Sequence, residues 1–137
     1  MPRDIVVLDT NVLVSALLNP FGAPARLLAL VTSGDLVAAY DERILAEWND
    51  VLRRPRFAFP SSEIDALLRT LEREGLRVSG NVEAHLPDPD DASFLEVAAT
   101  CGATLITGNV RHFPPEYRLG VTVTDPSSFL ASRGAPV

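Results

Sequence analysis

The chain has 137 residues, of which 47% are hydrophobic and 22% are charged, the composition of an ordinary folded protein. This balance excludes a disordered chain or a collagen-like fibre, and the length predicts a single domain over residues 1–137. The net charge of −6 argues against a protein held to nucleic acid by its bulk charge. It does not exclude a nucleic-acid enzyme whose carboxylates are offset by bound cations.

Two further features limit where the protein works and what it can bind. No apolar run approaches the roughly 18 residues that a membrane span needs, and Asp4 and Asp9 interrupt the stretch where a signal peptide would be apolar. We therefore expect a cytoplasmic protein with no membrane partner. Cys101 is the one cysteine, which excludes an internal disulfide and a metal site built from thiolates.

The predicted elements alternate between strands and helices. In chain order, the pattern predicts a strand at 5–8, helices at 12–18 and 24–32, a strand at 36–40, a helix from the cap Asp41 to Arg53, a helix at 63–74, a short strand at 76–78, a helix at 88–101, strands at 104–107 and 121–124, and a last helix at 127–132. Strands joined by helices form right-handed crossovers and parallel pairs. We therefore predict an α/β fold, a three-layer α/β/α domain with a mainly parallel central sheet.

Polar residues follow two of these strands directly. Asp9-Thr10-Asn11 comes after the first strand, and Thr107-Gly108-Asn109 lies at the tip of the strand that begins at 104. Ligands bind beyond the carboxyl ends of the strands in such sheets, so these tips are candidate site segments. Two simpler interpretations stay open, a helix cap for Asp9 and an ordinary turn for the second tip.

Two helices carry carboxylates beside their apolar stripes. Asp91 shares helical spacing with Phe94, Leu95 and Ala98, so its carboxylate is predicted to face the core or the floor of a cleft. Glu47 flanks the apolar stripe of the 41–53 helix. The alternatives are that Asp91 is a first-turn acid that favours the helix dipole and that Glu47 is a solvated charge.

The combination of these residues points to a chemistry. If Asp9, Glu47, Asp91 and Asn109 converge, they form an all-oxygen ligand set with three charges, which suits Mg²⁺ or Mn²⁺ and not zinc. Carboxylate-held Mg²⁺ activates water and offsets charge that builds on a phosphate, as in phosphodiester hydrolysis.

Five segments, in this order along the chain, resemble the motifs of PIN domains. They are residues 7–15 (VLDTNVLVS), 44–47 with 51–55 (ILAE and VLRRP), 88–95 with Ala98 (DPDDASFL), 105–109 with 112–114 (LITGN and HFP), and 126–130 (PSSFL). The second segment is similar to a subgroup of toxin components of toxin–antitoxin systems, the VapC-like ribonucleases. The resemblance covers nearly the whole chain.

The resemblance implies a function and a set of roles. It implies an Mg²⁺- or Mn²⁺-dependent endoribonuclease that cleaves RNA, often the toxin half of a pair neutralised by a small antitoxin protein, and often a homodimer. It gives metal-binding roles to Asp9, Glu47 and Asp91, and makes Thr107 the best candidate to orient a ligand or water.

The chain departs from the family pattern at one position. Many PIN domains have Asp at the tip where this sequence has Asn109, which supplies a carbonyl oxygen without a formal charge. The departure leaves open whether one or two metal ions bind. It also keeps an alternative function open, a degenerate PIN domain that binds RNA or a protein partner without cleaving it.

Other residues support weaker hypotheses. A phosphatase of the haloacid dehalogenase type needs a second Asp two positions after Asp9, but Asn11 stands there and the chain has no Lys. The cluster of Arg53, Arg54 and Arg56 would contact RNA phosphates or form a solvated face. The pair at 111–112 would touch substrate, or its histidine would pack beside the neighbouring phenylalanine.

Overall fold

The centre of the protein is a parallel β-sheet. A computed structural model describes residues 4–133, and its five strands lie in the order β3-β2-β1-β4-β5 with every pairing parallel. The strands are Asp4–Leu8 (β1), Leu36–Tyr40 (β2), Leu76–Arg77 (β3), Thr104–Ile106 (β4) and Val123–Thr124 (β5). The predicted mainly parallel sheet is confirmed.

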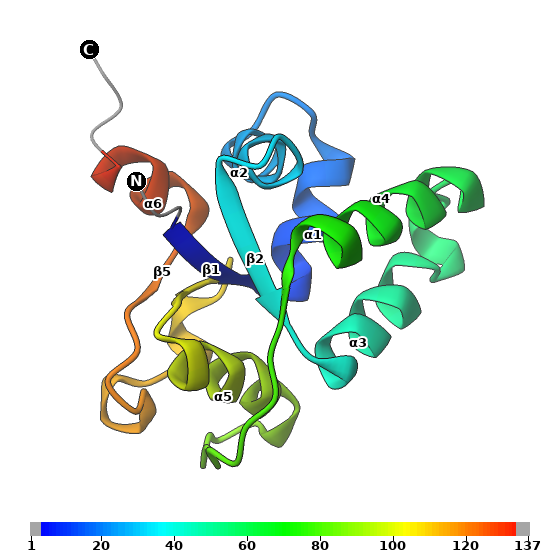
Figure 1. Cartoon of the computed structure of the whole chain (residues 1–137). Coiled ribbons are helices and arrows are strands. Elements are labelled where there is room, and N and C mark those ends of the chain that lie inside the picture. The colour runs from blue at the N-terminus through cyan, green and yellow to red at the C-terminus, as the bar shows by residue number, and fades with distance from the viewer. Residues whose placement is uncertain (1–3, 134–137) are drawn as a thin grey trace.

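Helices cover both faces of this sheet (Figure 1). They are Thr10–Leu18 (α1), Ala23–Thr32 (α2), Glu42–Leu52 (α3), Ser61–Glu74 (α4), Ala92–Cys101 (α5) and Pro126–Ser132 (α6). Helix α5 packs against β1, β2 and β4, whereas α2 packs against β2, α1, α4 and α6 on the other side. The architecture is the predicted three-layer α/β/α fold.

The strand order places a functional edge at the middle of the sheet. From β1 the chain moves outward through β2 to β3, and it then returns past β1 to place β4 on the other side. This reversal between β1 and β4 is the topological switch point, where open α/β sheets bind their ligands beyond the strand ends. The backbone N–H of Asp9 donates to the carbonyl of Ile106 at 2.9 Å, which ties the two strand ends together.

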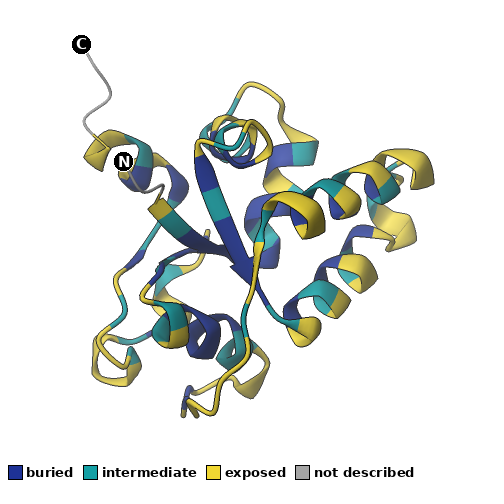
Figure 2. Cartoon of the chain, viewed as in Figure 1, coloured by how far each residue is buried: buried dark blue, intermediate teal, exposed yellow. Residues whose placement is uncertain are grey.

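The core lies on both faces of the central strands (Figure 2). Val6, Val7 and Leu8 of β1 are fully buried, as expected for a short continuous apolar run in a parallel strand. On α3, Trp48 is also fully buried, and its indole N–H donates to the carbonyl of Leu8 at 3.2 Å. This bond fixes one turn of α3 beside the carboxyl end of β1.

The structure differs from the predicted elements mainly at residue 88. Instead of one helix from 88, Pro89–Asp91 forms a 3₁₀ turn and α5 begins at Ala92. The turn is tight because the Asp88 carboxylate accepts from the N–H of Asp90 at 3.0 Å and the Asp88 carbonyl accepts from Asp91 at 3.1 Å. Asp91 therefore lies just before the helix and not on its regular stripe. The last two strands are also shorter than predicted, so Thr107 lies beyond the end of β4.

Among the residues described, no single helix is long and apolar enough to cross a membrane. Helices α1 and α2 reach that length and composition only as a pair, and they meet at a bend of 106°.

Candidate functional site

Asp9 lies at the switch point and is held by the tip of β4. Its side chain is buried, and its Oδ2 accepts hydrogen bonds from Thr107 Oγ1 at 2.7 Å and from Asn11 Nδ2 at 3.4 Å. The Thr107 hydroxyl in turn accepts from the N–H of Asn109 at 3.0 Å, which fixes the direction in which it donates. Asp9 occupies the N-cap position of α1 but makes no capping bond there. Its carboxylate is therefore free of the helix-cap role that the sequence left open.

Glu47 faces the same site from α3. Because the neighbouring Trp48 is anchored to the end of β1, Glu47 is brought against the start of α1. Its Oε2 accepts a hydrogen bond from the hydroxyl of Thr10, a buried residue adjacent to Asp9. Glu47 is thus partly buried and directed toward Asp9, and the interpretation as a solvated flanking charge is wrong.

Asp91 completes the group from the start of α5. Its side chain is 14% exposed, and its buried Oδ2 has no hydrogen-bond donor in the described part of the chain. His112 lies beside this oxygen: its Nδ1 is 3.4 Å from Asp91 Oδ2, on a half-exposed side chain. A buried carboxylate oxygen without a donor is costly, and in a native protein it calls for an ion, a water or a functional role.

The pKa of each of the three carboxyl groups is raised above its ordinary value. Burial is the largest cause in each case, and the charge of Asp9 further raises the pKa of both Glu47 and Asp91. For Asp91 these effects, with the charge of Asp88, raise the pKa from its ordinary 3.8 to about 6. For Asp9 the hydrogen bond from Thr107 offsets part of the effect of burial. Carboxylates that share a poorly solvated site repel, and a bound cation would relieve the repulsion.

Asn109 lies at the rim of this acidic site (Asp9, Glu47 and Asp91). Its side chain is exposed and makes no hydrogen bond within the described residues, although its backbone N–H contacts Thr107. The adjacent Gly108 donates its N–H to Asn11 Oδ1 at 2.9 Å, so the β4 tip is tied to the β1 tip. The second tip is therefore not a simple turn, because it supports both Asp9 and Asn11.

The acidic site fits a hard divalent cation in its chemistry. Its three acids supply only oxygens, and the buried Oδ2 of Asp91 has no hydrogen-bond partner within the described residues. Among residues 4–133, no three His, Cys, Asp or Glu side chains lie close enough together to enclose an ion. Mg²⁺ does not need such a cage, because it keeps several waters and takes one or two carboxylates from the protein.

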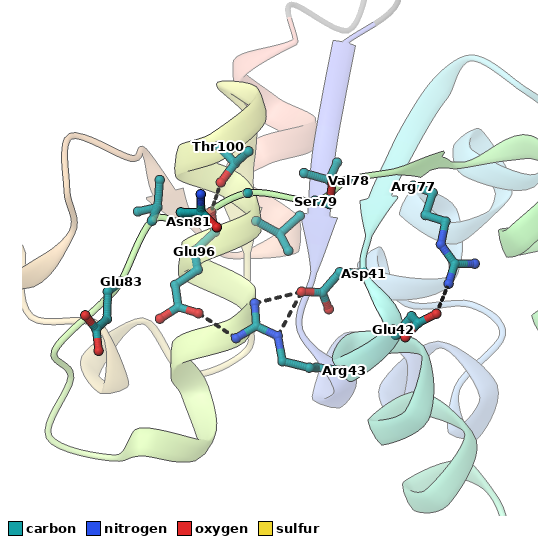
Figure 3. A pocket seen from close by; sticks show the side chains of 13 residues that line it. Asp41, Glu42, Arg43, Arg77, Val78, Ser79, Asn81, Glu83, Glu96 and Thr100 are labelled. Atoms are coloured by element: carbon teal, nitrogen blue, oxygen red, sulfur yellow. Dashed lines mark hydrogen bonds and ion pairs between the residues drawn. The ribbon is translucent and has the colours of Figure 1, made fainter.

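A second cluster of charges lies beside the acidic site and was missed from the sequence (Figure 3). Glu96 on α5 is buried, and it accepts from Arg43 Nη1 at 2.6 Å and from the N–H of Ala84 at 2.8 Å. Arg43 also pairs with Asp41 at 2.7 Å. Through its bond to Glu96, Arg43 links α3 to α5. Asp41, Arg43 and Glu96 line a cavity of about 700 Å³. Glu96 follows Leu95 in an apolar helix, and no local pattern indicated its partner.

Sequence reasoning also left His112 undecided between packing and contact with substrate. The structure separates it from its neighbour: Phe113 is fully buried, whereas the His112 imidazole is half exposed and faces Asp91. Its charge also lowers the pKa of Asp9. His112 therefore belongs to the surroundings of the acidic site.

Comparison with known proteins agrees with this fold. Residues 5–111 match the sequence profile of the PIN domain. An uncharacterized protein, MJ1680 from Methanocaldococcus jannaschii, is 31% identical over 108 residues, covering 76% of this chain and 70% of that protein. The chain belongs to the PIN domain family. PIN domains are generally nucleases, so membership supports a nuclease role.

Two solved structures share the fold at low sequence identity. The crystal structure of VapBC2 from Rickettsia felis, bound to a DNA fragment from its promoter, aligns with a TM-score of 0.57 and 14% identity, covering 88% of this chain and 98% of that chain. PAE2754 from Pyrobaculum aerophilum aligns with a TM-score of 0.59 and 14% identity, covering 98% and 91%.

Proposed function

We propose that this PIN domain is an Mg²⁺- or Mn²⁺-dependent endoribonuclease that hydrolyses phosphodiester bonds of RNA. The observation that carries the proposal is the acidic site at the switch point. There Asp9, Glu47 and Asp91 come from three separate elements, each has a raised pKa, and the buried Asp91 Oδ2 has no donor within the described residues. A protein gains nothing in stability from such an arrangement, and the repulsion makes sense where a cation binds.

Each residue of the acidic site has a role in this proposal. Asp9, Glu47 and Asp91 would hold the ion, and Asn109 would add a neutral oxygen at the rim. Thr107 fixes the direction of the Asp9 carboxylate through its 2.7 Å hydrogen bond. When bound, the ion would activate water and offset the charge that develops on the scissile phosphate.

We further propose that the protein is the toxin component of a toxin–antitoxin pair, with a cognate antitoxin protein and a homodimeric state. The support is the shared fold with a VapBC complex. Leu18 and Phe21, near the connection between α1 and α2, are 59% and 89% exposed and offer apolar surface to a partner. Light scattering of the purified chain would measure its oligomeric state.

Cleavage of RNA with and without metal tests the main proposal. A labelled RNA should be cleaved with Mn²⁺, and excess EDTA should abolish cleavage. Asp9→Asn should reduce the rate by at least about 100-fold, since it removes charge stabilisation at the reacting phosphate. Asp35→Asn removes an exposed carboxylate at the far end of the sheet and is the matched control. Cleavage that survives both EDTA and Asp9→Asn would contradict the proposal.

One observation favours a second candidate, a PIN domain that binds RNA without cleaving it. The uncharged Asn109 stands at the tip where many family members have Asp, and its side chain is exposed. This candidate predicts RNA binding by the wild type in EDTA and no cleavage in Mn²⁺.

A further inference from the structure

Three arginines at the end of α3 differ in how they are held. Arg53 is bound from several sides: it donates to Asn49 Oδ1 at 2.8 Å and to Ser61 Oγ at 3.2 Å, and pairs with Asp65 at 2.5 Å. These bonds tie α3 to α4, so Arg53 is structural. The solvated-face and RNA-contact hypotheses therefore apply to the other two arginines.

Arg54 and Arg56 are largely free. Arg54 has a side chain that is 46% exposed, and its one ion pair within residues 4–133 is a 3.3 Å contact with Asp50, which is itself 74% exposed. Exposed pairs of this kind contribute little to stability and are readily exchanged. Arg56 is exposed and has no carboxylate partner in the described chain; its guanidinium lies 4.8 Å from the centre of the Phe57 ring.

The residues after Arg56 form an aromatic stack. The rings of Phe57 and Phe59 lie 5.4 Å apart and are nearly parallel, with an interplanar angle of 10°. Between them Ala58 adopts a left-handed conformation with φ of 53°, which non-glycine residues rarely take. Both rings are only partly buried: Phe59 packs against the hydrophobic core, and Arg56, over the Phe57 ring, is exposed to solvent. Aromatic rings and arginine planes are the groups on which unpaired bases stack.

The basic and aromatic surface formed by Arg54, Arg56, Phe57 and Phe59 lies next to the acidic site. Glu47 and Asp50 lie on α3, and Arg54, two residues beyond the end of that helix, pairs with Asp50 at 3.3 Å. A strand bound at the acidic site would thus meet Arg54 first and the stack next.

We propose that Arg54 and the stack of Arg56, Phe57 and Phe59 bind the unpaired RNA strand beside the cleaved phosphate. Arg54 binds a neighbouring backbone phosphate, and a base stacks on the group of Arg56, Phe57 and Phe59. The inference rests on the proposed ribonuclease function, and it deepens it by assigning single-stranded RNA as the substrate. Because the chain carries a net charge of −6, a phosphate backbone needs such a local group of cations.

Binding and cleavage measured separately test this assignment. Binding of a short fluorescein-labelled single-stranded RNA is followed by fluorescence anisotropy across a range of salt concentrations. EDTA is present, so that the RNA is not cleaved during the measurement. Arg54→Gln and Arg56→Gln should each weaken binding about three- to tenfold, and Arg54→Gln should reduce the salt slope by about one. In Mn²⁺ the same variants should raise KM with kcat within about twofold, because the contact is lost equally in the ground and transition states.

The aromatic contribution has its own variants and control. Phe57→Leu should weaken binding of single-stranded RNA about fivefold or more without changing the salt slope, whereas Phe57→Tyr should retain it. Arg69→Gln removes an equivalent charge from an exposed arginine on α4 that has no ion-pair partner among the described residues, and it should bind as the wild type does. Thermal unfolding checks the fold, and if Phe57→Leu is unfolded the two arginine variants decide.

The possible failures are distinct. If the wild type cleaves RNA but Arg54→Gln and Arg56→Gln behave like Arg69→Gln, the assigned surface is wrong and the ribonuclease function stands. If the wild type does not cleave RNA, the proposed function fails, and binding in EDTA decides the assigned surface alone. Duplex RNA bound as tightly as the single strand would overturn the stacking of a base.

Discussion

Two carboxylates at helix α5 are almost equally buried, but only one of them has hydrogen-bond and ion-pair partners that offset its charge. The side chains of Asp91 and Glu96 are 14% and 12% exposed. Glu96 accepts from Arg43 at 2.6 Å and from the N–H of Ala84 at 2.8 Å, so its charge is compensated. Asp91 has a buried oxygen without a donor and a pKa raised to about 6. Glu96 is therefore satisfied within the fold, whereas Asp91 keeps a buried oxygen without a hydrogen-bond partner in the described residues, as our proposal of a bound ion requires.

The largest expected effect is the loss of stability when Glu96 is removed. Glu96→Ala leaves the N–H of Ala84 and one side of Arg43 without a partner, and it should lower the free energy of unfolding by about 2–4 kcal/mol. Urea denaturation in EDTA measures this change. Glu83→Ala, at an exposed carboxylate of the same cavity, should change stability by less than about 0.5 kcal/mol. Equal effects of the two variants would remove the contrast with Asp91.

At Asp91, by contrast, a substitution is expected to raise the free energy of unfolding. Asp91→Asn keeps the shape of the side chain and removes one of three repelling charges, so it should stabilise the metal-free protein by roughly 1–2 kcal/mol at pH 7.5. It should also reduce the rise in melting temperature that Mn²⁺ produces. Asp90→Asn, at the exposed neighbour, should change neither quantity much. A loss of stability in Asp91→Asn would show that the carboxylate has a structural role.

The pH dependence of stability gives an independent test. The carboxyl group of Asp91 has a higher pKa in the folded state, about 6 against 3.8, so the folded protein binds a proton more tightly than the unfolded chain. Its contribution to stability is therefore lost as pH rises through the window from about 4 to 6, and it stays lost above pH 6. The stability difference between wild type and Asp91→Asn should grow by about 2 kcal/mol between pH 4.5 and 6.5. A difference that is constant with pH would contradict the assignment.

The smallest effect is expected at position 109. Asn109→Asp adds a charge at the rim, but the side chain is exposed, so solvent screens its interaction with an ion. We expect about threefold tighter Mn²⁺ binding, followed by thermal shift, and a loss of metal-free stability under about 0.5 kcal/mol. Asn81→Asp at an exposed residue of the neighbouring cavity is the control. Unchanged Mn²⁺ affinity would limit the acidic site to Asp9, Glu47 and Asp91.

The local pattern predicted most of the fold. The continuous apolar run before Asp9 gave a buried strand, and Asp41 caps α3 as expected, accepting from the N–H of Ile44 at 3.0 Å. The prediction was wrong where two short-range effects compete. At 88–91, the Asp88 side chain and Pro89 favour a tight 3₁₀ turn over the first turn of an α-helix.

The acidic site, too, was predicted only in part from the sequence. The sequence placed Asp9 and Thr107 at strand ends, because a switch from apolar to polar residues is visible locally. It gave Glu47 and Asp91 only as carboxylates beside apolar stripes. Their direction follows from long-range contacts, such as the bond from Trp48 to Leu8 that fixes α3 against β1.

By itself, the sequence determined the alternation of strands and helices, the parallel sheet and the polar strand tips, because periodicity and capping act over a few residues. Only the tertiary structure decided which carboxylates are compensated. Glu96 finds Arg43 across 53 positions of the chain, and Asp91 finds no donor for its buried oxygen. Such pairings depend on crossovers that bring distant elements together, and no local pattern encodes them.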